Sequence, residues 1–182
     1  MNKLFKTLSF VAAIAFFATA CVPPVVDVAK AAPAAADYQA VLGKSMSDQD
    51  VASFIASNAC TQTGSYYLCR PAGLAFWTNE DQIVKTAYLY VSDSEGFSGY
   101  KGELPLKLAA GDTMAAVEQK FGHPRDVHAL PGPWEPGLPD EGSSPDHTHY
   151  WAIYKRFGVT VIYNTPDASD KNATIHAILV RK

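Results

Sequence analysis

Two histidines are the leading candidates in this chain for a chemical role such as metal binding. His147 and His149 lie two positions apart and follow Asp146. On an extended strand such a pair projects from one face, where imidazole and carboxylate groups could bind zinc. Zinc hydrolysis also needs a third ligand and a general base at definite places, and the sequence has no H-E-x-x-H or comparable spacing. We therefore expect no metal site, and a metal-dependent hydrolase that uses His147 and His149 is a remote alternative.

Two other segments imitate catalytic motifs. Ser98-Gly99-Tyr100-Lys101 fits S-x-x-K, but its companion motifs are only approximated, and they precede it in the wrong order. Gly43-Lys44-Ser45 imitates the end of a phosphate-binding loop, but Tyr38 occupies the position of the leading glycine. We expect no catalytic residue, no enzyme activity and no cofactor. Four acidic residues lie in predicted turns: Glu80, Asp81, Asp93 and Glu95. Their spacing does not bring two carboxylates together next to apolar residues that would raise the pKa of one of them, so we expect all four to be solvated.

A proline-rich segment next to the histidines is the candidate contact surface. Residues 131–145 read PGPWEPGLPDEGSSP, and so long a loop inside a compact domain is typical of a binding segment. Proline stiffening lowers the entropy lost on binding, and Trp134 could anchor a partner. Alternatively, Trp134 folds back and covers the sheet. The residues expected to contact a partner are Trp134, Glu135, Asp140, Glu141, His147 and His149.

The N-terminus resembles a bacterial lipoprotein signal. Residues 1–20 contain two lysines, then an apolar run, then Ala18-Thr19-Ala20 before Cys21, which we expect to be lipidated. Ordinary cleavage after Ala20 is the alternative, and it would leave a soluble periplasmic protein. Leu8–Phe17 is shorter than the roughly 20 residues that span a bilayer. By resemblance to lipoproteins, Val22 after the cysteine implies a lipid anchor on the periplasmic face of the outer membrane.

The elements that must position these residues follow a flexible tether. Residues 21–37 are the lipidated cysteine and an alanine and proline-rich linker, so we expect a single domain over residues 38–182. Lys3 and Lys6 leave with the signal, so 13 of the 15 basic residues remain against 18 acidic ones. This balance disfavours a nucleic-acid partner, because phosphate binding needs clustered basic residues.

Two cysteines remain after the signal is removed, at positions 60 and 69. The signal delivers the chain to an oxidising compartment, so we expect Cys60 and Cys69 to form a structural disulfide. A redox or zinc role would need closer spacing or more ligands.

A weak internal duplication predicts an α+β fold. Each half, about 44–91 and 110–182, begins with a capped helix and continues with three strands joined by short turns, which favours antiparallel pairing. Ser47 with Asp50 resembles a capping box for the first helix, and Asp112 or Thr113 caps the second. We expect the two helix-plus-three-strand repeats to form one antiparallel sheet packed by helices. The predicted strands are Tyr66–Cys69, Gly73–Trp77, Ile83–Val91, Tyr150–Tyr154, Phe157–Tyr163 and Thr174–Val180.

The segment around the second helix resembles a known family. Leu104-Pro105-Leu106, Gly111-Asp112-Thr113, Val117 and Phe121-Gly122-His123-Pro124 look like the helix signature of the SmpA/OmlA (BamE-like) domain. The tandem arrangement is similar to the β-lactamase-inhibitor-protein fold. The resemblance implies a small α+β sandwich without a cofactor that functions by protein binding.

These observations predict a non-enzymatic envelope lipoprotein that binds a protein partner in the periplasm. An inhibitor or immunity protein for a periplasm-acting toxin or enzyme is the first expectation, because blocking an active site requires only complementary shape and charge. A BamE-like accessory lipoprotein of outer-membrane assembly or envelope integrity is the alternative.

Overall fold

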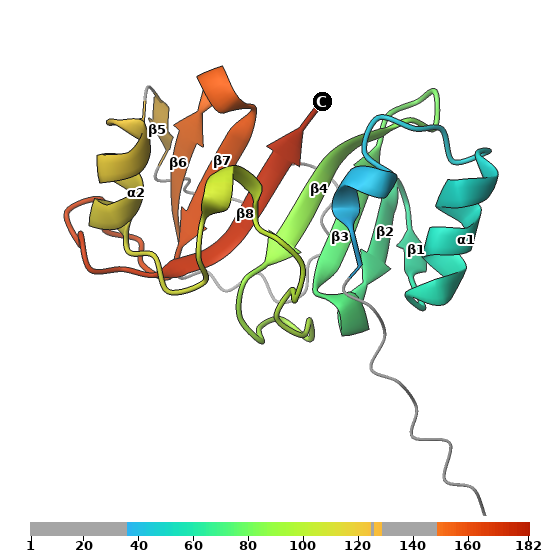
Figure 1. The fold of residues 1–182 in the computed structure, drawn as a ribbon, viewed down its shortest axis with the longest axis horizontal. Coiled ribbons are helices and arrows are strands. Elements are labelled where there is room, and N and C mark those ends of the chain that lie inside the picture. The colour runs from blue at the N-terminus through green and yellow to red at the C-terminus, as the bar shows by residue number, and fades with distance from the viewer. Residues whose placement is uncertain (1–35, 125, 129–148) are drawn as a thin grey trace, which may run out of the picture. The chain divides into compact units, whose positions relative to one another are not determined.

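An antiparallel sheet organises the part of the chain that the computed structural model describes, which is residues 36–124, 126–128 and 149–182 (Figure 1). In these residues eight strands form one sheet, in the order β1-β2-β3-β4-β8-β7-β6-β5. The α+β class and the antiparallel pairing are therefore confirmed. The strands are β1 (Thr61–Thr63), β2 (Tyr66–Cys69), β3 (Leu74–Thr78), β4 (Val84–Tyr90), β5 (Asp126–His128), β6 (Tyr150–Tyr154), β7 (Val159–Tyr163) and β8 (Ile175–Arg181).

Each of the two α-helices precedes four strands in the chain. α1 (Gln49–Ser57) comes before β1 to β4, and α2 (Met114–Phe121) comes before β5 to β8. The expectation of three strands per half missed β1 and β5, because three-residue strands are too short to show an alternating apolar pattern. That the halves are repeats of one unit stays a prediction.

Short 3-10 helices join the strands in a similar way in both halves. η2 (Arg70–Ala72) links β2 to β3 and ends at Gly73, and η4 (Lys155–Phe157) links β6 to β7 and ends at Gly158. Both glycines have left-handed backbone angles, φ 69° and φ 64°, which glycine adopts without a Cβ clash. The remaining 3-10 helices are η1 (Tyr38–Ala40) and η3 (Pro105–Lys107).

The two halves of the sheet meet in the middle, where β4 pairs with β8. The register runs from Thr86 opposite Arg181 to Tyr90 opposite Ala177. This pairing joins the two halves through backbone hydrogen bonds, so the sheet is continuous from β1 to β5.

Both α-helices pack on the same face of the sheet. In Figure 1, α1 lies beside β1 to β3, and α2 lies beside β5 and β6. Val51 of α1 and Met114 and Val117 of α2 are buried in one hydrophobic cluster, and the segment between β4 and α2 adds Tyr100 and Leu108 to it. The strand residues that alternate inward complete this core, among them Leu74, Phe76, Leu89, Val161, Tyr163 and Ile178.

The caps of the two helices differ. Thr113 caps α2, because its hydroxyl accepts a hydrogen bond from the Ala116 N–H at 3.3 Å. The predicted capping box of Ser47 and Asp50 is wrong, because Asp48 holds the cap position of α1 and makes no side-chain cap bond. The Ser47 N–H instead bonds the Ser45 hydroxyl within a turn.

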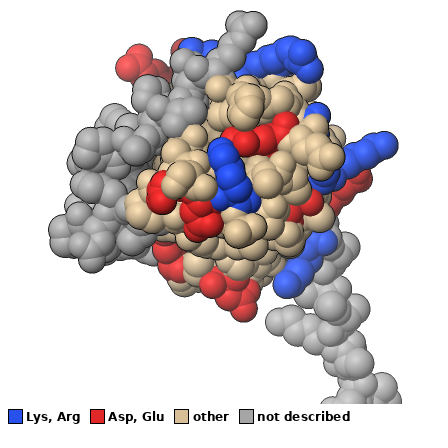
Figure 2. All heavy atoms as spheres, turned by 90° about the vertical axis from the view of Figure 1, so that its left-hand side faces the viewer, with Lys and Arg blue, Asp and Glu red and all other residues tan. Residues whose placement is uncertain are grey.

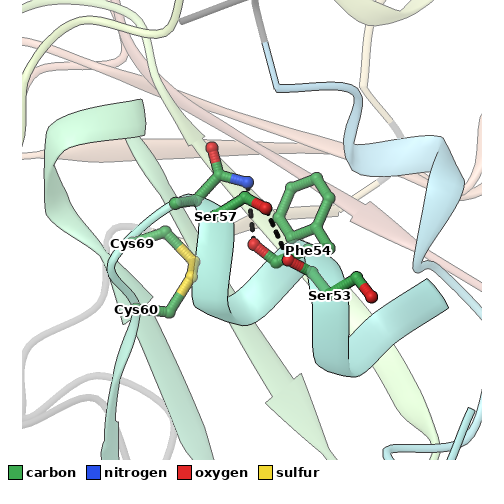
Figure 3. Close-up of a disulfide and its surroundings, with 6 residues drawn as sticks. Ser53, Phe54, Ser57, Cys60 and Cys69 are labelled. Atoms are coloured by element: carbon green, nitrogen blue, oxygen red, sulfur yellow. Dashed lines mark hydrogen bonds between the residues drawn. A yellow bond between two sulfur atoms is a disulfide. The ribbon is translucent and has the colours of Figure 1, made fainter. Parts of the chain in front are cut away.

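The predicted disulfide is confirmed, because Cys60 and Cys69 are bonded (Figure 3). It joins the segment after α1 to the end of β2. Figure 3 shows the bond beside the last turn of α1, where the Ser57 hydroxyl donates to the Ser53 carbonyl at 2.7 Å. Cys69 is fully buried, and the Cys60 N–H donates to the Ile55 carbonyl, so the bridge belongs to the folded core.

Charged side chains are mixed on the side of the unit that α2 borders (Figure 2). Acidic and basic groups lie among uncharged ones on that visible face. Two ion pairs belong to α2 and its neighbours, Lys120 with Asp112 at 2.6 Å and Lys171 with Glu118 at 2.7 Å. Among the described residues, no helix is both long enough and apolar enough to cross a membrane.

Candidate functional site

The face of the sheet opposite the helices has an aromatic layer of its own. Its residues alternate along the strands with those of the helix-side core, so the sheet carries apolar side chains on both faces. Trp77 is partly buried there, and the other members are buried: Tyr66, Leu68, Ala75, Tyr88, Tyr90, Phe97, Trp151, Ile162, Ala177 and Leu179.

A tight turn after β4 is attached to this layer. The backbones of Ser94 and Phe97 exchange two hydrogen bonds, and the residues between them, Glu95 and Gly96, both have positive φ. This is the geometry of a type I′ turn. The Phe97 ring stacks on Tyr90 with 4.0 Å between the centroids, so the turn is fixed against the sheet.

Arg70 also holds the turn in place. Its guanidinium carbon lies 4.8 Å from the centre of the Phe97 ring, and its Nη1 donates to the Glu95 carbonyl at 2.9 Å. Stacking and hydrogen bonding therefore set the position from which the Glu95 side chain projects.

The turn brings Glu95 to two histidines, and these three residues form the candidate site. His176 lies on β8, and His149 directly precedes β6. The Glu95 Oε1 atom is 3.5 Å from His176 Nε2, and the two imidazole rings are 4.1 Å apart. Each residue offers one possible ligand atom, and the three atoms lie within 4.8 Å of one another. We call these residues the Glu95–His149–His176 cluster.

The fold assembles the cluster through the β4 and β8 register. Tyr90 is opposite Ala177, and the Val91 N–H donates to the His176 carbonyl at 2.9 Å, so the chain that leaves β4 passes directly beside His176. His149 joins the cluster from the position just before β6, and β6 is separated from β8 only by β7.

Asn164 fixes the ring of His176. Its Oδ1 lies 3.0 Å from His176 Nδ1, while its Nδ2 donates to the Thr174 hydroxyl at 3.4 Å. Because Oδ1 is an acceptor, Nδ1 carries a proton, and Nε2 is the ring nitrogen that faces Glu95. His176 Nε2 is buried, and its neighbour is Glu95 Oε1 at 3.5 Å, which is longer than a good hydrogen bond.

The environment shifts the pKa values of two members of the cluster. The His176 side chain lowers the pKa of the Glu95 carboxyl, although partial burial opposes that shift. Desolvation lowers the pKa of His149 to about 4, and the neighbouring His176 adds to the decrease. At neutral pH the cluster therefore contains an ionised carboxylate and a neutral His149.

The predicted contact residues fall mostly outside the described part of the chain. The residues outside it are Trp134, Glu135, Asp140, Glu141 and His147. The signal peptide, Cys21 and most of the linker also lie outside it. His149 is described, and it is half-buried beside His176. His123 is separate from the cluster, because its exposed side chain lies 3.7 Å from Glu118 near the end of α2.

Two members of the cluster were not predicted as site residues. Glu95 was expected to be a solvated turn residue, and it is an exposed residue of a turn, but its carboxylate also faces His176, which the sequence did not indicate. His176 gave one sequence signal, since it is a lone polar residue within the apolar run of β8, Ile175–Arg181.

The fold and the site together define an α+β protein with an antiparallel sheet and a histidine and carboxylate cluster at the end of β4. Comparisons with protein-family models, with curated proteins and with solved structures each found no match. The resemblance to the SmpA/OmlA domain therefore stays a prediction from the residues that carry it.

Proposed function

We propose that the chain is a lipid-anchored envelope protein that acts by binding another protein, without catalysis, through the connection between β5 and β6. One observation carries this proposal, and it is the length of that connection. His128 pairs with Trp151, so the 22 residues 129–150 leave and return to the same position on the sheet.

The corresponding connection in the first half of the chain is far shorter. Thr63 pairs with Tyr66, and only Gly64 and Ser65 join them. A hairpin in this fold can thus close with two residues. By the logarithmic dependence of closure entropy on loop length, the longer connection costs on the order of 2 kcal/mol more. Because closing the hairpin does not require this segment, a binding role accounts for it better than a structural one.

The composition of the segment suits a protein contact. Trp134 is a residue type that frequently dominates interface energies, and its neighbouring prolines reduce the entropy lost on binding. Glu135, Asp140 and Glu141 make the segment acidic, so we propose a partner with a basic surface at its binding cleft. An inhibitor or immunity protein for a toxin or enzyme acting in the periplasm meets this description.

The disulfide supports the proposed compartment. Disulfides persist in oxidising compartments such as the bacterial periplasm, and the bond between Cys60 and Cys69 agrees with export by the N-terminal signal. The proposed anchor is a lipid on Cys21 at the periplasmic face of the outer membrane.

Site-specific photo-crosslinking in cells tests the proposal. A photoreactive amino acid at position 134 should capture one discrete envelope protein. The control is the same amino acid at position 52, because Ala52 is exposed on α1. Identical capture from both positions would count against the segment as the contact surface.

A shortened chain provides the second arm of the test. Replacing residues 129–148 with Gly-Ser retains His149 and Tyr150 and leaves a four-residue connection between the paired His128 and Trp151. We expect the unfolding midpoint of this variant to stay the same or rise, because a shorter connection costs less closure entropy, and we expect the variant to lose binding to the captured partner. Undiminished binding by the folded variant would refute the proposal. If the partner is an outer-membrane assembly protein and gene deletion causes detergent sensitivity, the BamE-like alternative replaces the inhibitor role.

A further inference from the structure

We propose that Glu95, His149 and His176 bind a divalent transition-metal ion, with zinc as the preferred ion. The proposal does not depend on segment 129–148, because the three residues lie within the described sheet and its turns; it shares only His149 with the residues expected to contact a partner. Two imidazoles and one carboxylate are a ligand set that proteins use for zinc, with further coordination positions open to water.

The distances in the cluster are close to those that a tetrahedral ion requires. Zinc bonds of about 2.1 Å place neighbouring ligand atoms roughly 3.4 Å apart. Glu95 Oε1 and His176 Nε2 are 3.5 Å apart, and all three ligand atoms lie within 4.8 Å. A shift of about 1 Å by His149 would complete the set, and that side chain is only half-buried.

His176 provides the strongest argument for a cation. Its Nδ1 is held by Asn164, which leaves Nε2 directed toward the Glu95 carboxylate in a position that is almost fully buried. At 3.5 Å the imidazole nitrogen and the carboxylate oxygen need a positive charge between them, because two bare acceptors at this distance would repel. A metal ion satisfies both acceptors, and so does a proton on His176, which is the competing explanation.

The surroundings of the cluster match those of a metal site. A metal-bound histidine usually donates its second ring N–H to a carbonyl or carboxylate oxygen, which orients the ring. Asn164 Oδ1 has this role toward His176, and the Asn164 N–H in turn donates to the Thr174 carbonyl at 3.0 Å. On the opposite side, Phe97 and Arg70 fix the turn that carries Glu95. His176 and Glu95 are thus each held by neighbouring groups.

Calorimetric titration of the purified, metal-stripped full chain with zinc chloride is the test. We expect one ion per chain and an increase in the thermal unfolding midpoint. His176→Gln and Glu95→Gln should each weaken zinc binding by more than the roughly 10-fold to 100-fold that outer contacts contribute, and Asn164→Ala by about that amount. The matched control is His123→Ala, because His123 is an exposed histidine outside the cluster and should leave the affinity unchanged.

Three outcomes would overturn the proposal. The first is no zinc binding by the wild-type chain, which would leave the proton as the group between Glu95 and His176. The second is unchanged affinity in folded Glu95→Gln and His176→Gln variants, which would place the ion elsewhere. The third is an equal loss in His123→Ala. Circular dichroism of each variant separates loss of the site from loss of the fold.

Discussion

Gly73 and Gly158 occupy similar positions in the two halves, but the space around them differs. Both have positive φ, so alanine at either position costs about 1 to 2 kcal/mol in backbone strain. A Cβ on Gly73 would also lie closer than 3.0 Å to three backbone atoms, of Ser98, Gly99 and Tyr100. A Cβ on Gly158 would meet only the Arg181 carbonyl, at 3.1 Å.

This difference predicts unequal effects of the same substitution. We expect Gly158→Ala to lower the free energy of unfolding by about 1 to 2 kcal/mol, and Gly73→Ala by about 3 kcal/mol or more, because overpacking adds to the strain. Urea denaturation followed by circular dichroism measures both. Equal losses in the two variants would show that the segment 98–100 moves away at little cost.

The helix caps give a second matched pair. Thr113→Ala removes the hydroxyl that accepts from the Ala116 N–H, and we expect it to destabilise the chain by about 1 kcal/mol. Asp48→Ala should cost less than half as much, because Asp48 makes no side-chain cap bond and contributes only through the helix dipole. Unfolding midpoints in urea compare the two. A larger loss in Asp48→Ala would contradict the assignment of the caps.

At the scale of elements, the disulfide stabilises the free edge of the sheet. β1 (Thr61–Thr63) is an edge strand with all three residues exposed, and Cys60 directly precedes it. Removing the bond by the double substitution Cys60→Ala and Cys69→Ala should lower stability by about 2 to 3 kcal/mol in the chain-entropy account. Chemical reduction of the wild-type chain should have a similar effect.

Hydrogen exchange localises that effect. Without the disulfide, we expect the amides of β1 and β2 to lose more protection than those of β6 and β7, because local opening of the edge adds to the fall in global stability, and β6 and β7 lie on the other side of the β4 and β8 pair. Uniformly faster exchange in all strands would show that the bond acts only through the unfolded chain.

The elements were largely predictable, and the site was largely not. β2 and β6 agree with the predicted limits, because apolar runs such as Tyr66–Cys69 and Tyr150–Tyr154 indicate buried strands. The polar strand β1 carries no such signal. Glu95 and His176 meet only because of the register between β4 and β8, and a single sequence does not specify which strands of two halves become neighbours. His149 was a candidate site residue from its spacing alone.

At the scale of the whole folded unit, the two halves share one sheet and one core. β4 and β8 pair along five residues each, and the helix-side cluster contains Val51 from the first half and Met114 from the second. Separating the halves would break the β4 and β8 pairing and divide this shared cluster. We therefore predict that the two halves unfold together in one cooperative transition.

Two tryptophans report on the halves separately, because Trp77 lies on β3 and Trp151 on β6. In a Trp134→Phe background, variants that retain only Trp77 or only Trp151 should give fluorescence transitions in urea that coincide with each other and with circular dichroism. Ile178→Ala, at a fully buried position of β8, should shift both transitions equally and lower stability by about 2 to 5 kcal/mol, because it leaves a cavity in the shared core. A Trp77 transition that keeps its midpoint when the Trp151 transition moves would show that the first half folds on its own, and the continuous sheet would then join two independently stable units.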